Sequence, residues 1–156
     1  MNNLGFRPED VALPVGHFLA GKLVPGGADI AVTSPGNGRI LAHLPEAGAD
    51  LVDEAAQTAA RVQRQSGWAS CAPRERAKVL RRWADLVERN AMELARLETV
   101  CSTRPIAQTV GWDIPFLAEG IRFFAEYCDK VGGDVAATAT NLLGMTVYEP
   151  YGVTGA

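Results

Sequence analysis

The segment that most constrains the fold of this chain is its last nine residues, Tyr148 to Ala156 (YEPYGVTGA). Glu149 to Gly152 has the composition of a turn, and Val153 to Ala156 reads as the opening of a small-residue strand of the kind buried in a parallel sheet. A lone strand has no partner for its backbone N–H and C=O groups, and burying them unpaired is costly. We therefore expect the chain to be the first part of a longer protein.

Composition argues against a nucleic-acid or membrane partner. The chain has 15 Lys and Arg against 18 Asp and Glu, for a net charge of -3, so it has no basic excess. Its apolar runs are far shorter than the ~20 residues of a membrane span, and its N-terminus lacks the pattern of a signal peptide. The three cysteines (Cys71, Cys101 and Cys128) include no Cys-x-x-Cys pair, so we expect ordinary thiols of a reduced, cytoplasmic protein.

The N-terminal zone is expected to hold short strands after a flexible start. Residues 1–16 carry prolines and glycines without periodicity and are predicted to be flexible. Strands are then predicted around turns, at residues 17–20, 22–24, 30–33 and 39–44. The turn Ser34-Pro35-Gly36-Asn37-Gly38 lies between two of these strands and lacks the third glycine of a dinucleotide loop. It is therefore interpreted as a tight turn and not as a cofactor site.

Three main helices are predicted in the middle of the chain. The first, over residues 49–66, has an alanine-rich stripe that lets it approach a neighbour closely. The second, over 73–99, starts at Pro73, has a possible break near Asn90, and is expected to bury Trp83 as a core anchor. The third starts at 112–115, with Asp113 as its cap, and ends at Gly132-Gly133.

Two helix faces admit more than one interpretation. The arginine face of the second helix (Arg74, Arg76, Lys78, Arg81, Arg82 and Arg89) is predicted to be solvated and partly paired with Asp85 and Glu88, with a site for an anionic partner as the alternative. The third helix is aromatic, with Phe116, Gly120, Phe123, Phe124, Tyr127 and Val131. These residues are expected in the core, with the wall of an apolar tunnel as the alternative.

The sequence contains no catalytic or metal-binding pattern. The histidines, His17 and His43, have no metal-like spacing to each other or to the cysteines. Cys71 precedes a helix start, where a thiol can become nucleophilic, but no base partner can be identified for it. We therefore predict no catalytic, cofactor-binding or metal-binding residue from the motifs alone.

Eight short motifs in order resemble the N-terminal third of the aldehyde dehydrogenase superfamily, from about His17 to the end of the chain. They are SPGNGRIL (34–41), GWA (67–69), PRER (73–76), LARLET (94–99), RPI (104–106), RFFA (122–125), DK (129–130) and EPYGV (149–153). Each motif alone is weak, and their shared order and spacing carry the resemblance.

The resemblance implies an α/β fold: a hairpin and edge strands, three main helices, an oligomerisation-arm strand and the first strand of a Rossmann-type sheet. The implied domains are a flexible N-terminus (1–16), the N-terminal part of the nucleotide-binding domain (17–134), arm strands (135–150) and the start of the first Rossmann strand (151–156). Family members oxidise small aldehydes to acids with NAD+ or NADP+, and form homodimers or homotetramers. A cysteine thiolate attacks the aldehyde, hydride passes to the nicotinamide, and a glutamate activates water.

The resemblance also assigns residues. Phe116 and Gly120 match the helix that lines the substrate entrance, whereas the catalytic and cofactor-binding residues are expected beyond residue 156, so the isolated chain is expected to be inactive. Cys101 stands where many relatives have an aspartate of a monovalent-cation site, and a thiol is a poor ligand for a hard cation. Two alternatives without catalysis are a stand-alone helical interaction module on the arginine face and a small apolar-ligand binder on the aromatic helix.

Overall fold

The computed structural model describes residues 4–155. Its helices, with a short 3-10 turn (Pro8–Asp10) and a π-helical turn (Thr109–Asp113), are α1 (Ala49–Gln65), α2 (Pro73–Arg89), α3 (Ala91–Ser102), α4 (Ile106–Gln108) and α5 (Ile114–Tyr127). Its strands are β1 (His17–Leu19), β2 (Lys22–Val24), β3 (Asp29–Thr33), β4 (Ile40–Pro45), β5 (Val135–Ala136) and β6 (Gly144–Met145).

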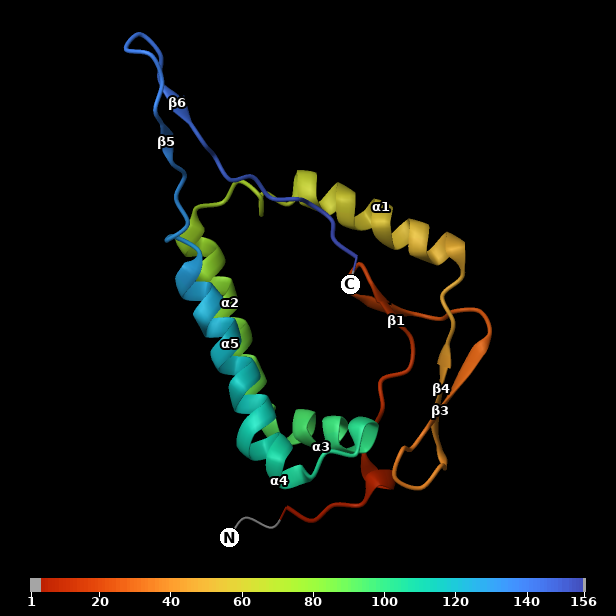
Figure 1. Ribbon diagram of the computed structural model, residues 1–156. Helices are drawn as coiled ribbons and strands as arrows, with labels where there is room; N and C mark the ends of the chain where they lie inside the picture. The colour runs from red at the N-terminus through yellow and green to blue at the C-terminus, as the bar shows by residue number, and fades with distance from the viewer. Residues whose placement is uncertain (1–3, 156) are drawn as a thin grey trace.

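These elements outline an open frame, as Figure 1 shows. Helices α2 and α5 lie side by side along one edge, α1 runs separately across another, and the β3–β4 pair faces α2 and α5 from the far side. The α2–α5 pair has the most extensive packing between helices, whereas α1 has no buried residue. The alanine stripe predicted to bring α1 close to a neighbour is therefore uncovered in this chain.

The described strands form three separate antiparallel pairs, β1–β2, β3–β4 and β5–β6. The predicted hairpin around Gly21 is confirmed, because β1 pairs with β2 through a turn in which Ala20 and Gly21 both have positive φ (50° and 83°). Such a turn matches the right-handed twist of the two strands. The Gly36–Gly38 turn joins β3 to β4, and Gly38 N–H donates to the Ser34 carbonyl at 2.8 Å.

The core lies mainly between α2 and α5, with one residue from α3, and is built mainly from small residues. Its buried cluster comprises Ala84, Val87, Ala95, Ile114, Ala118 and Ile121. Ala84 and Ala118 have no exposed surface at all. Because alanine adds so little bulk, the two helices can pack with their backbones close together.

The prediction that Trp83 anchors this core is wrong, since 53% of its surface is exposed. The apolar stripe of α2 is wider than the strip that α5 covers. Ala77, Ala84 and Val87 take the covered side, and Trp83 and Leu86 remain largely outside it. The aromatic residues of α5 depart from the core prediction for the same reason, because Ile114, Ala118, Ile121 and Ala125 are its buried residues.

The helix boundaries follow the predictions in part. The break near Asn90 is confirmed, and the Asn90 side-chain amide donates to the Leu86 carbonyl at 2.8 Å. Asp113 does not cap α5, because it lies in the π-helical turn and makes no cap hydrogen bond; its carboxylate binds Arg104 instead. Helix α5 ends at Tyr127, earlier than the glycine pair predicted to stop it.

The C-terminal segment is more irregular than predicted. The alternating residues of 137–148 yield only the two-residue strand β6, which pairs with β5 just before this range. Residues 151–155 form no strand, and Ala156 lies outside the described residues. This segment passes beside the α1–α2 link, where Tyr148, Tyr151 and Trp68 line a shared depression.

Candidate functional site: the aromatic face of α5

The two residues assigned to the substrate entrance, Phe116 and Gly120, lie on the face of α5 opposite its core side. Phe116 is 62% exposed, and Gly120 is half-buried, with nothing within 4 Å of the position that a Cβ would occupy. We define the aromatic face as Trp112, Phe116, Gly120, Phe123, Phe124 and Tyr127. Its residues recur mainly at spacings of three and four, which places them along one side of the helix.

The rings of the aromatic face contact one another. Trp112 and Phe116 are stacked, with centroids 5.7 Å apart and planes 8° from parallel. Phe123 meets Phe124 edge-on at 5.4 Å and Tyr127 at 5.0 Å. Gly120 lies between these two groups in sequence, so the face has aromatic side chains on both sides of a position without a side chain.

The segment that carries Trp112 is fixed from two sides. Arg104 donates two hydrogen bonds to Asp113, from Nε at 2.7 Å and from Nη2 at 2.9 Å. At the start of the π-helical turn, the fully buried Thr109 hydroxyl donates to the Ile106 carbonyl and lies 3.1 Å from the Thr99 hydroxyl. π-Helical turns occur frequently at functional sites, which is consistent with a role for this segment.

Ion pairs hold α5 against α2 in antiparallel orientation. Arg74 binds Asp129, Arg81 binds Glu126, and Arg122 binds both Asp85 and Glu88. The expected pairing of Asp85 and Glu88 with the arginine face of α2 is therefore wrong. Their partner is Arg122 of α5, because both carboxylates lie on the side of α2 that faces that helix.

These pairs shift the titration of the carboxylates involved. Hydrogen bonds from Arg122 lower the pKa of Glu88 below its ordinary value of 4.5. Hydrogen bonds from Lys130 first, and Arg74 second, lower the pKa of Asp129 below 3.8. Two carboxylate hydrogen bonds raise the pKa of Arg122. All three groups are in contact with solvent, so their contribution to stability is modest.

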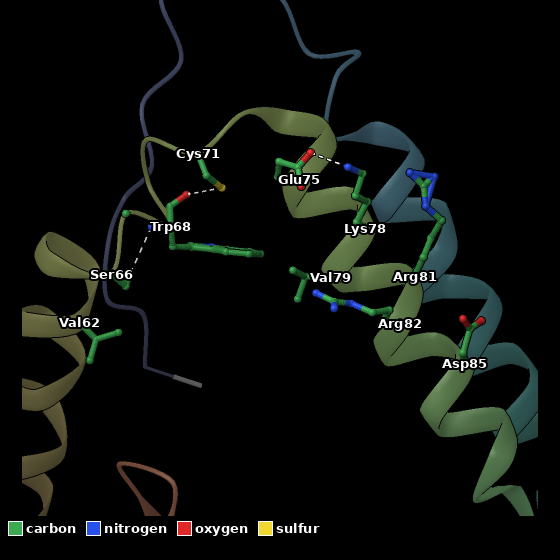
Figure 2. A pocket seen from close by; sticks show the side chains of 11 residues that line it. Val62, Ser66, Trp68, Cys71, Glu75, Lys78, Val79, Arg81, Arg82 and Asp85 are labelled. Carbon is green, nitrogen blue, oxygen red and sulfur yellow. Dashed lines mark hydrogen bonds and ion pairs between the residues drawn. The ribbon is translucent and has the colours of Figure 1, made fainter.

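An open groove of about 850 Å³ lies between the end of α1 and α2, and Figure 2 shows Trp68, Val79 and Arg82 on its walls. Cys71 also lines it and donates from Sγ to the Trp68 carbonyl at 3.2 Å. Arg76 donates to the Cys71 carbonyl at 2.6 Å. No histidine is among the residues that line this groove, so none of them supplies Cys71 with the imidazole base of a cysteine nucleophile.

The other reactive side chains are scattered. Cys101 lies in the last turn of α3 and is exposed, Cys128 follows α5, and His17 and His43 lie in β1 and β4. Residues 4–155 contain no group of three or more His, Cys, Asp or Glu side chains placed to hold a metal ion. Within the same residues, no helix is both long enough and apolar enough to span a membrane.

Comparison with known proteins decides the family. A sequence model described as "Aldehyde dehydrogenase family" matches residues 24–156. The chain belongs to the aldehyde dehydrogenase family. The resemblance inferred from the eight motifs is confirmed, as is the α/β fold expected from it, and the structural neighbours match through their N-terminal regions.

The relatives of this aldehyde dehydrogenase chain include one named for its cofactors and one named for its substrate. The NADP/NAD-dependent aldehyde dehydrogenase PuuC of Escherichia coli (strain K12) is 43% identical over 116 residues, which are 74% of this chain and 23% of PuuC. The aminoacetaldehyde dehydrogenase of Pseudomonas aeruginosa is 35% identical over 130 residues, 83% of this chain and 26% of that protein.

A solved structure shows the same fold. The aldehyde dehydrogenase KauB from Pseudomonas aeruginosa superimposes with a TM-score of 0.86 at 32% identity, covering 92% of this chain and 30% of KauB. The chain therefore spans less than a third of the length of these relatives.

Proposed function

We propose that this chain is the N-terminal part of an NAD(P)+-dependent enzyme that oxidises a small aldehyde to a carboxylic acid. The observation that carries the proposal is the family match over residues 24–156. An indole-3-acetaldehyde dehydrogenase whose structure holds NAD+ shares the fold with a TM-score of 0.83 at 31% identity, covering 92% of this chain and 29% of that one. Bound NAD(P)+ would accept hydride from the substrate.

The chemical step is proposed to use a cysteine thiolate and a glutamate base supplied by sequence beyond residue 156. Cys71, Cys101 and Cys128 lie apart from one another along the chain, and none of them matches the nucleophile motif of the family. The Gly36–Gly38 turn joins two strands, so it lacks the helix N-terminus that binds a pyrophosphate. The cofactor site is therefore also assigned to sequence outside this chain.

The contribution proposed for this chain is to frame the substrate entrance and to support assembly. The assignment of Phe116 and Gly120 to the entrance comes from the resemblance, and it is supported by the aromatic, largely exposed side of α5 on which they lie. We assign the domains as the family resemblance implies: residues 17–134 to the nucleotide-binding domain, 135–150 to the oligomerisation arm and 151–156 to the start of the first Rossmann strand. The whole enzyme is proposed to be a cytoplasmic homodimer or homotetramer.

The alternative of an interaction module on the arginine face has less support. Arg81 is paired with Glu126 of α5, Arg74 with Asp129 just after that helix, and Arg76 donates to a backbone carbonyl. Much of the positive charge proposed for an anionic partner is thus already engaged within the chain.

The test compares the purified 156-residue chain with the longer polypeptide obtained by translating the gene past Ala156. The purified 156 residues should produce no NADH from NAD+ and an aldehyde, whereas the polypeptide read past Ala156 should do so. A continuation containing the cysteine and glutamate of the family supports the proposal. Production of NADH by the isolated chain, or a stop codon directly after Ala156, would contradict it.

A further inference from the structure

The N-terminal end of the aromatic face offers a flat surface for stacking. The rings of Trp112 and Phe116 are nearly parallel, and their side chains are 64% and 62% exposed. Aromatic rings prefer offset-stacked or edge-on neighbours, and such pairs gain more than burial of area alone provides. A third planar ring can therefore extend this stack on its open side, which a ring that is not planar cannot do equally well.

The charges around this stack are mostly neutralised within the chain. Arg104 is paired with Asp113, and Arg122 with Glu88. Glu119, exposed and three residues beyond Phe116, forms no ion pair among the residues that the structure describes. A ligand carboxylate at the stack would lose hydration without gaining a free cation, and would meet the negative charge of Glu119.

We propose that the substrate class of this enzyme is an uncharged aldehyde with a planar aromatic group, and that Trp112 and Phe116 are its specificity-determining residues. This inference rests on the function proposed above. The aromatic group stacks on the Trp112–Phe116 pair. Aldehydes with a saturated ring bind less well because they lack the π face, and aldehydes with a second, anionic group are disfavoured by Glu119.

The test measures binding to the 156-residue chain by NMR, following the indole N–H signals of its three tryptophans. Three methyl ketones serve as unreactive probes that share one functional group: acetophenone is aromatic, cyclohexyl methyl ketone is saturated, and levulinate is anionic. Trp68 and Trp83 are also exposed but lie outside the aromatic face, so they are internal controls for non-specific contact.

Acetophenone should shift the Trp112 signal at least about threefold more than the signals of Trp68 and Trp83, and more than cyclohexyl methyl ketone does. Levulinate should leave Trp112 unshifted. The Phe116→Leu variant should weaken acetophenone binding about threefold, whereas Phe18→Leu, which changes an exposed ring in β1, should leave it unchanged. Equal shifts at all three indoles, or equal binding of acetophenone and cyclohexyl methyl ketone, would overturn the inference.

A kinetic comparison separates this inference from the proposed function. The polypeptide extended past Ala156 should oxidise benzaldehyde with a higher kcat/KM than cyclohexanecarboxaldehyde or succinic semialdehyde. Equal kcat/KM values for the three aldehydes would overturn the aromatic preference and leave the dehydrogenase function standing. If acetophenone shifts the Trp112 signal selectively but the extended polypeptide reduces no NAD(P)+ with any of the three aldehydes, aromatic binding is supported and the dehydrogenase function is overturned.

Discussion

Arg122 of α5 holds Glu88 of α2 with two hydrogen bonds, each 2.6 Å long, one to each carboxylate oxygen. Paired contacts of this kind fix orientation as well as distance. Together with the pairs at Arg81 and Arg74, they set the register of the two helices, and the register sets which side of α5 faces outward.

Arg122→Ala should lower the midpoint of thermal unfolding, because both partner carboxylates lose their cation. Arg122→Lys should fall between the wild type and Arg122→Ala, since lysine keeps the charge and loses the paired geometry. The differences should shrink in ~1 M salt, where charges are screened over about 3 Å. Arg64→Ala, on exposed α1, is the control; an equal effect of the two alanine variants would contradict the prediction.

The stability of the chain should fall as the pH drops below about 4.5. The pKa values of Glu88 and Asp129 are depressed in the folded state, so both groups stabilise the fold above their unfolded pKa values. That contribution is lost as the pH falls through the folded values. The test measures the urea midpoint of unfolding from pH 7 to pH 3. The midpoint of the double variant Glu88→Gln, Asp129→Asn should decrease less over this range than the midpoint of Glu54→Gln, an exposed change in α1.

Ala84→Leu should destabilise the fold by about 1–3 kcal/mol, because the α2–α5 contact has no room for three more carbons. Ala84 is fully buried in that contact. Ala59→Leu is the matched control, since Ala59 is exposed on α1, and it should change the free energy of unfolding by less than about 0.5 kcal/mol. Similar effects of the two changes would show that α2 and α5 are not closely packed in solution.

The two glycines Gly120 and Gly26 should respond to alanine in opposite directions. Gly120 has open space around it inside a helix, so Gly120→Ala should stabilise the chain by about 0.5–1 kcal/mol. At Gly26 an added Cβ would lie 2.6 Å from His17 Nε2 and 2.7 Å from Pro45 Cβ, and Gly26→Ala should destabilise by about 1–3 kcal/mol. Chemical denaturation measures both, and a loss of stability in Gly120→Ala would mean that its face is covered.

Backbone amides of α1 should exchange with deuterium faster than those of α2 and α5. Helix α1 buries no side chain, and local opening is easiest where few buried contacts must be broken. Hydrogen exchange followed by mass spectrometry of peptides from 49–65 and 114–127 tests this. Slower exchange in the first peptide than in the second would contradict the structure.

The sequence predicted where elements begin more reliably than which side of each element is buried. Pro73 and Asn90 act through local backbone chemistry, and the start of α2 and the break after it were both anticipated. The exposure of Trp83 depends on what α5 presents to α2, and α5 presents alanine, isoleucine and no ring. Large apolar residues such as Trp83 were predicted to form the core. The alanines that form the close helix contact are not distinguished in the sequence from alanines on an exposed face.

The candidate site was predicted in a similarly partial way. Phe116 and Gly120 came from the family resemblance, and the structure adds Trp112, which the sequence placed only at a helix start. The i to i+4 spacing of Trp112 and Phe116 could have suggested their contact. The near-parallel orientation of the rings could not be read from spacing, because it depends on the π-helical turn that carries Trp112.

The arrangement of the described strands as separate two-stranded pairs affects how the isolated chain behaves in solution. Each of these strands has one neighbour only, so along its other side it has backbone donors and acceptors that no second strand satisfies. Such exposed strand edges can form hydrogen bonds with strands from other copies of the chain. We therefore expect the isolated polypeptide to self-associate as its concentration rises, and dilute samples to be the condition in which its monomer can be studied.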